Sequence, residues 1–181
     1  YTTPENVFFW DATENGTSGN AIGWTPGTSG SGRSQGYIVY SDNGGGGDFD
    51  LSQTISLSGT YNKADVAYTL QENTTDPAGT GAVAEGWHLI GNPFPSNLST
   101  TALFADWATN GSVLAYKGIH IWDAVNGQYK AILDGVAISN YNDPVSAGND
   151  SNVIAPFQAF WVKAEAGETA FSVKNSHRVT S

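Results

Sequence analysis

The chain has no cysteine and no methionine among its 181 residues. Disulfide bridges and thiolate metal sites are therefore excluded, because both need the cysteine sulfur. Basic residues are also scarce, with seven Lys and Arg against seventeen Asp and Glu, and the formal net charge is −10. Since binding to a phosphate backbone needs clustered cations, nucleic acids are excluded as partners.

A long apolar run is missing too, and no stretch approaches the roughly 18 residues that a membrane-spanning helix needs. We therefore expect no membrane insertion. The chain opens at YTTPENVFFW, without an initiator Met or the layout of a signal peptide. We interpret it as a mature product or an excised piece.

Charged residues make up only 13 % of the chain, and Gly, Ser, Thr and Asn are abundant instead, which favours strands joined by tight turns. Alternating runs such as Val66–Leu70 predict strands with one face on a core. Continuous apolar runs predict central strands, covered on both faces, at 37–40 and 160–162. Further strands are predicted over 7–12, 87–91, 119–124, 128–133 and around 171–173.

One helix is predicted after Ser99, a good N-cap residue, and Asn110-Gly111 would close it. Leu103, Phe104 and Trp107 would share its buried face. Together these patterns predict a single all-β domain over 1–181. Its fold class would be a β-sandwich of jelly-roll or Greek-key type with one short helix.

The tripeptide Trp-Asp-Ala occurs at 10–12 and again at 122–124. The first copy is followed by GYIVYSD at 36–42 and the second by AFWVKAE at 159–165, which predicts an internal duplication with half-repeats at about 7–70 and 87–179. The shared positions are Trp, Phe, Tyr and Val at strand spacing, so the repeated part is expected to be scaffold. Four strand tryptophans are accordingly expected in the core: Trp10, Trp87, Trp122 and Trp161.

The string GWHLIGNPFPS at 86–96, with GYIVY before it and IHIWDA, VIAPFQAFWVKA and FSVKNSHRV after it, resembles a module of large extracellular Bacteroidota proteins. Those proteins are exported by the type IX secretion route, and the module lies just ahead of their C-terminal sorting domain. The sequence departs from the family pattern at His88, where Asn is usual, and at Phe157 and Ala159, where Gly is usual. The resemblance implies a secreted β-sandwich and brings no catalytic residues with it.

The string GNPFPS can also be interpreted from its residues alone. Two X-Pro bonds fix an extended, rigid corner after Gly91, and the Asn92 side chain is expected to bond neighbouring backbone groups. We therefore interpret the string as a structural corner.

Residues for catalysis are sparse. No G-x-S-x-G elbow is present, and the candidate bases are His88, His120 and His177, of which the first two fall inside predicted strands. No H-E-x-x-H pair suggests zinc. We therefore expect no enzyme activity, although a glycoside hydrolase needs only two carboxylates brought together by the fold.

Two Gly- and Asx-rich loops offer the hard oxygen ligands that Ca²⁺ prefers. The better candidate is SDNGGGGDFD, with Asp42, Asn43, Asp48 and Asp50; the other is NDPVSAGNDSN at 142–152. Ca²⁺ is the only cofactor that the sequence suggests. Neither loop has EF-hand spacing, and a polar turn held by Asx hydrogen bonds is the favoured interpretation of both, because such turns are the commoner use of Asp and Asn.

Flat aromatic side chains are candidates for stacking on sugar rings, with amides holding the hydroxyl groups. These sugar-binding candidates are Trp24, Tyr61, Tyr129 and Tyr141, with Asn140 and Asn142 beside the last. The alternative for each aromatic is packing.

The sequence thus predicts a non-catalytic structural or adhesive module of a secreted protein, located outside the cell or on its outer surface. Its expected partners are neighbouring modules of the same chain, polysaccharide, or copies of itself. The alternative functions are a carbohydrate-binding module and, third, a small glycan-active enzyme.

Overall fold

The computed structural model of the chain describes residues 7–11, 24–26, 35–39, 60–70, 86–110, 118–123, 127–133, 153–164 and 170–179. The strands are β1 (Val7–Trp10), β2 (Trp24–Pro26), β3 (Tyr37–Val39), β4 (Val66–Thr69), β5 (Trp87–Gly91), β6 (Leu98–Ser99), β7 (Gly118–Asp123), β8 (Gln128–Leu133), β9 (Val153–Ile154), β10 (Ala159–Lys163) and β11 (Ala170–Val173). The helices are α1 (Thr100–Asn110) and the short 3-10 helix η2 (Asn175–His177).

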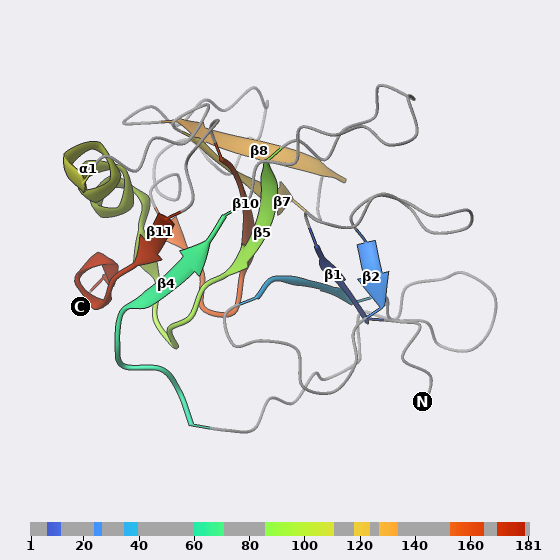
Figure 1. Cartoon of the computed structure of the whole chain (residues 1–181), viewed down its shortest axis with the longest axis horizontal. Coiled ribbons are helices and arrows are strands. Elements are labelled where there is room, and N and C mark those ends of the chain that lie inside the picture. The colour runs from blue at the N-terminus through green and yellow to red at the C-terminus, as the bar shows by residue number, and fades with distance from the viewer. Residues whose placement is uncertain are drawn as a thin grey trace.

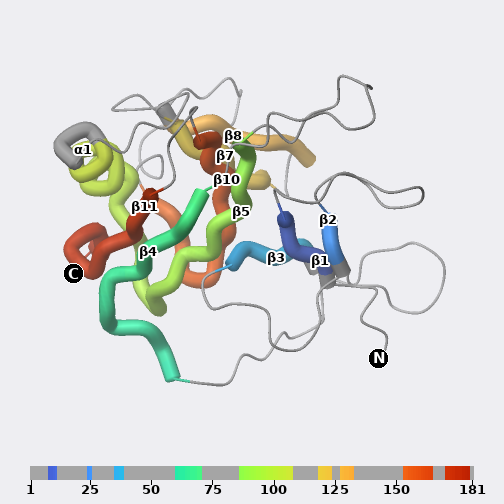
Figure 2. Tube along the Cα trace, viewed as in Figure 1, coloured from blue at the N-terminus to red at the C-terminus, as the bar shows by residue number. Residues whose placement is uncertain are grey.

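A four-stranded sheet in the order β5-β10-β7-β8 lies in the middle of the molecule. The three-stranded sheet β2-β1-β3 lies on one side of it, and the pair β11-β4 lies with α1 on the other (Figure 1). A fourth, two-stranded sheet joins β6 to β9. All these pairings are antiparallel, and the tube in Figure 2 shows β3 passing from β1 towards the central sheet. The predicted all-β sandwich with one helix is confirmed.

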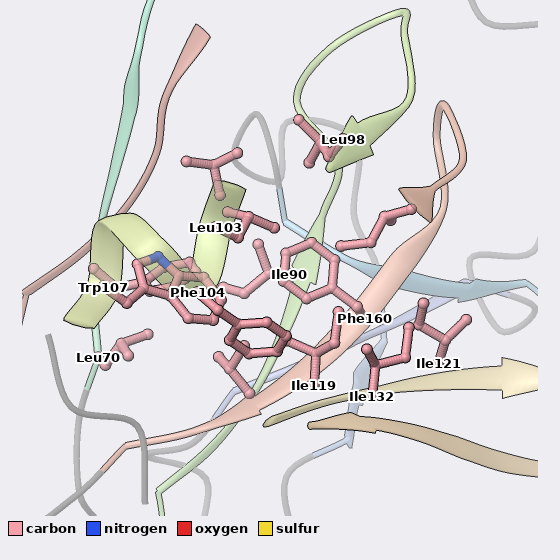
Figure 3. Packing of buried hydrophobic residues seen from close by; sticks show 14 of the residues in the cluster. Leu70, Ile90, Leu98, Leu103, Phe104, Trp107, Ile119, Ile121, Ile132 and Phe160 are labelled. Carbon is pink, nitrogen blue, oxygen red and sulfur yellow. The ribbon is translucent and has the colours of Figure 1, made fainter. Parts of the chain in front are cut away.

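The core lies between the central sheet and α1 (Figure 3). Side chains alternate between the two faces of a strand, and on β10 the buried residues are Phe160 and Val162, both 0 % exposed. On β7 the buried residues are Ile119 and Ile121, and Ile132 lies opposite the first of them on β8. One face of the central sheet is therefore an aliphatic and phenylalanine-rich interior.

Helix α1 begins as the sequence predicts. The Ser99 hydroxyl accepts a hydrogen bond from the backbone N–H of Ala102 at 3.2 Å, which is the N-cap arrangement. Leu103, Phe104 and Trp107 are all buried in the core, so the predicted apolar face is confirmed. Of the described tryptophans, Trp107 is the one that belongs to the buried core cluster.

The GNPFPS segment forms the predicted corner, and Asn92 holds it together. The Asn92 side chain is buried, accepts a hydrogen bond from the Phe94 N–H at 3.0 Å, and donates to the carbonyls of Ser96 and Ala155 at 2.9 Å each. From the C-terminal segment, the Arg178 guanidinium lies over the Phe94 ring at 5.7 Å and donates to the Ser96 hydroxyl at 2.7 Å. The segments of Ala155 and Arg178 are thereby fastened to this corner.

The two copies of Trp-Asp-Ala have the same strand order and register. Strand β1 lies between β2 and β3, just as β7 lies between β8 and β10. Trp10 is opposite Trp24, and Trp122 is opposite Tyr129. Phe8 is opposite Ile38, and in the second copy His120 is opposite Trp161. These are the pairs that aligning GYIVY with AFWVK predicts, while the boundaries 7–70 and 87–179 stay a prediction.

Strand β3 connects two sheets. Among the described strands it pairs with β1 at the side of the three-stranded sheet, and the expectation of a central strand at 37–40 stays a prediction, because residues 40–59 lie outside the described part of the chain. The residues just before β3 leave β1 and approach β5, where the Gly36 N–H donates to the Leu89 carbonyl at 3.1 Å and Gln35 pairs with Ile90. The three-stranded sheet is thereby attached to the central one.

Candidate functional site

Six side chains surround a hollow of about 400 Å³ on the face of the central sheet that is turned away from the core. The lining residues are Trp10, Trp24, Trp87, His120, Tyr129 and Trp161, and we call this site the aromatic hollow. They come from six different strands of two sheets. Apart from the more exposed Tyr129, each is half-buried and keeps part of its surface accessible to solvent.

Strand alternation puts these side chains where they are. On β10, Trp161 lies between the core residues Phe160 and Val162 and must therefore point to the opposite face. Its direct partner on β7 is His120, and directly opposite residues share a face of the sheet. The same reasoning places Tyr129, which is opposite Trp122, on this face.

Trp161 is the centre of the ring arrangement. The rings of Trp10 and Trp24 stand at 79° and 89° to it, with centroid distances of 4.9 and 5.7 Å. The rings of Trp87 and Tyr129 stand at 85° and 84°, both at 6.4 Å. Such near-perpendicular packing suits the quadrupoles of aromatic rings and leaves flat faces turned in several directions.

Polar groups around the hollow mainly hold the rings in place. The Trp10 Nε1–H donates to the backbone carbonyl of Trp87 at 2.6 Å, which ties β1 to β5 directly. The Lys163 ammonium lies 5.7 Å from the centre of the Trp87 ring, a cation–π contact from the same face of the sheet. The hollow thus has a cation and hydrogen-bonding groups at its margin.

His120 is a lining residue whose pKa is shifted by its surroundings. Burial lowers the pKa of His120 below its ordinary value of 6.5, because the imidazolium would lose hydration. Its ring also packs edge to face against Trp87 at 5.2 Å. At neutral pH the described lining is therefore uncharged.

The hollow continues onto an exposed aromatic pair. Tyr129 contacts Trp161 inside the hollow and also contacts Trp122, whose ring centroid is 5.0 Å away. Trp122 is 51 % exposed and Tyr129 is 44 % exposed. Both project from the same face of the sheet as His120 and Trp161, so the aromatic surface runs without a break from the hollow along β7 and β8.

Of the sugar-binding candidates, the structure brings Trp24 and Tyr129 together in the hollow. Tyr61 lies apart from them, 58 % exposed, with the Lys63 ammonium 5.0 Å from its ring centre. Asn140, Tyr141 and Asn142 lie outside the described residues. The Ca²⁺ candidates Asp42, Asn43, Asp48 and Asp50, and the loop 142–152, lie outside them as well.

The expectation that four strand tryptophans fill the core is wrong. Trp10, Trp87 and Trp161 line the hollow, and Trp122 is exposed beside it. The physical reason is that the core covers only the opposite face of the central sheet. The sequence does show that Trp122 lies on the opposite face of its strand from Ile119 and Ile121, but it does not show which of the two faces is buried.

Metal ligands do not gather in the described part of the chain, where no group of three or more His, Asp or Glu side chains is placed to hold an ion. The nearest approach is a pair, in which His177 Nε2 lies 3.6 Å from Asp106 Oδ2. His177 is the buried member of this pair, Asp106 is partly exposed, and neither residue lines the hollow. No described helix is long and apolar enough to cross a membrane.

Residues 1–181 match the model of a family described as a domain of unknown function (DUF8693). No curated protein and no solved structure matches the chain. The site's chemistry must therefore be inferred from its own geometry.

Proposed function

The chain belongs to the DUF8693 family, and we propose that it is a non-catalytic adhesive module that binds glycans through the aromatic hollow. One observation carries the proposal. Four of the six tryptophans, with Tyr129 and His120, enclose about 400 Å³ outside the hydrophobic core. A volume of this size lies within the range of small-ligand sites.

The chemistry of the rings favours a sugar. One side of a pyranose ring consists of C–H groups with small positive partial charges, and these are attracted to the negative face of an aromatic ring. Neighbouring hydroxyl groups need hydrogen-bond partners, and His120 and the ammonium of Lys163 lie close by. An aromatic box with a few polar groups at its margin fits this combination of surfaces.

A binding role without catalysis is supported by what lines the hollow. None of its described lining residues is a carboxylate, Ser or Thr, so a pair of acids flanking a glycosidic bond is not among them. His120 is neutral at pH 7 and packs against Trp87, and the described lining holds no carboxylate that could act with it or with Tyr129. A small glycan-active enzyme is accordingly the least supported of the three candidate functions.

An extracellular location is part of the proposal. It rests on the resemblance of GWHLIGNPFPS and its neighbouring motifs to modules of secreted surface proteins. One backbone feature supports that resemblance: Phe157, which stands where those modules have Gly, has a φ of 61°. This is a conformation that glycine adopts far more readily than any other residue.

Affinity electrophoresis in gels containing neutral polysaccharides tests the proposal. We expect the wild-type domain to be retarded by at least one neutral glycan, and Trp161→Ala to lose this retardation, because Trp161 contacts four other rings of the hollow. Tyr61→Ala is the matched control, since it removes an exposed aromatic outside the hollow and should be retarded like the wild type. Absence of retardation of the wild type on every neutral glycan, or equal retardation of Trp161→Ala, would overturn the proposal.

A further inference from the structure

We infer that the ligand of the aromatic hollow is an extended, uncharged glycan chain that continues over Tyr129 onto Trp122, which forms a second, outer subsite. This inference rests on the proposed function, and it adds the ligand class and the length of the site. The exposed pair Trp122 and Tyr129 is its structural basis. The occupant proposed for the pair is the next part of the same glycan chain.

Continuity between the two subsites is given by Tyr129. Its ring lies 6.4 Å from Trp161 in the hollow and 5.0 Å from Trp122 outside it. Along β7, Trp122 follows His120 by two residues on the same face, which corresponds to about 7 Å of strand. A ligand that occupies the hollow therefore meets the outer pair if it extends along β7.

The exposure of the Trp122 side chain indicates that packing does not account for a tryptophan at this position. The corresponding pair of the first copy, Trp10 and Trp24, has similar ring geometry at 5.2 Å and 83°, but it is half-buried in the hollow. Trp122 is 51 % exposed, although it is a large aromatic side chain. A cross-strand contact with Tyr129 stabilises the sheet modestly, and smaller residues would serve for that. An open aromatic face at this position is instead suited to a ligand.

The net charge of the protein favours an uncharged glycan as the ligand. The protein carries a net charge of −10, which repels anionic polysaccharides over a distance of several ångströms. Among the described residues, Lys163 is a cation that contacts a ring of the hollow, and it lies over Trp87, on the strand that flanks β10 on the side away from β7. The outer pair is therefore remote in strand order from this positive charge, and acidic sugars would gain little there.

Isothermal titration with gluco-, manno- and chito-oligosaccharides, from monosaccharide to hexasaccharide, tests the inference. For the series that binds, we expect the wild-type affinity to rise by at least about tenfold with chain length, since a stacked tryptophan is a typical binding hot spot. Trp122→Ala should abolish this rise and leave the affinity for the shortest bound sugar within about twofold. Trp122→Phe should restore part of the rise, because phenylalanine keeps an aromatic face.

Several outcomes would overturn the inference. A wild-type affinity that does not change with chain length, or an unchanged rise in Trp122→Ala, removes the outer subsite while glycan binding in the hollow stands. Binding of oligogalacturonate as strong as that of neutral sugars contradicts the charge argument. Wild-type dimers in light scattering that Trp122→Ala dissociates would assign the pair to a second copy of the chain. No binding by the wild type to any of the sugars would overturn the proposed function as well.

A folding control accompanies each variant. The melting temperature of Trp122→Ala should stay within about 2 °C of the wild type, since the side chain is exposed and its removal leaves no cavity. If Trp122→Ala melts at a much lower temperature than the wild type, the dependence of affinity on chain length is measured with Trp122→Phe and Tyr129→Phe instead. Both keep the packed pair, so a chain-length effect that differs between them and the wild type cannot come from unfolding.

Discussion

His177 and Asp106 meet where the C-terminal 3-10 helix packs on α1, with 3.6 Å between the imidazole Nε2 and the carboxylate Oδ2. His177 is only 2 % exposed. Its Nδ1 accepts a hydrogen bond from the Lys174 backbone N–H at 3.0 Å, so the neutral ring carries its proton on Nε2, towards Asp106. The Lys174 ammonium bridges to the other carboxylate oxygen of Asp106 at 2.7 Å.

This buried imidazole predicts that the domain loses stability on acidification. Burial lowers the pKa of His177 below 6.5, and Asp106 and Asp65 offset this only in part. A depressed pKa means that the unfolded chain takes up the proton more readily, so the stabilising contribution is complete above pH 6.5 and is lost as the pH falls below it. His120 shifts in the same direction. Melting curves from pH 7.5 to 5 should show a falling midpoint, and His177→Gln a shallower fall; a midpoint that rises on acidification contradicts this.

Replacing Asn92 should destabilise the GNPFPS corner. Asn92→Ala removes hydrogen bonds to the buried N–H of Phe94 and to the partly buried carbonyls of Ser96 and Ala155, which together should cost about 2–4 kcal/mol of unfolding free energy. Asn62→Ala is the matched control. Asn62 makes the same kind of side-chain bonds to Ala64 in an exposed turn, and its loss should cost below about 0.5 kcal/mol. Urea unfolding measures both values, and equal losses would argue against the corner's structural role.

Phe157→Gly should stabilise the domain. The Gln158 N–H donates to the Ala155 carbonyl at 3.2 Å around Pro156 and Phe157, a turn with Pro second and a positive φ third, which is type II. Phe157 is 69 % exposed, so its side chain gives little packing in return for the strained backbone. Glycine should relieve about 1 kcal/mol, partly offset by its greater unfolded-state entropy. Phe157→Ala keeps the strain and should melt like the wild type; if it matches Phe157→Gly, strain is not the cause.

Gly36→Ala should disturb the attachment of the three-stranded sheet and weaken glycan binding. A Cβ at this position would lie 2.5 Å from Leu89 Cγ and 3.1 Å from Ala159 Cβ, so β3 must move away from β5 and β10. Overpacking of this kind should cost about 1–3 kcal/mol of stability. Because β1 and β2 carry Trp10 and Trp24 into the hollow, the affinity for the bound sugar should fall as well. Gly127→Ala, where a Cβ meets nothing within 4 Å, strains only a turn and should leave affinity unchanged.

Much of the local structure was predictable, because it depends on residues close together in the chain. The predicted strands over 87–91 and 128–133 agree with β5 and β8 residue for residue. Ser99 caps α1 as expected, and Asn92 bonds the backbone of its own corner. Two of the sugar-binding candidates, Trp24 and Tyr129, lie in the hollow.

The hollow itself was not predictable from the same patterns. Strand β7 has apolar groups on both faces, with Ile119 and Ile121 on one side and Trp122 on the other. Hydrophobicity cannot tell which face will meet another layer, since burial depends on partners from distant parts of the chain. Trp161 was assigned to the interior for this reason, although its neighbours Phe160 and Val162 fill the core and it does not.

The amino-acid sequence by itself determined most of the longer strands, where the helix begins and how the proline corner is held, since short-range sterics and hydrogen bonds decide these. The short strands β2, β6 and β9 were not among the predicted ones. Tertiary structure alone decided that α1 covers one face of the central sheet and leaves the other to Trp10, Trp24, Trp87 and Trp161. The difference has one cause: strand alternation separates two faces, and only long-range packing determines which of them is closed to solvent.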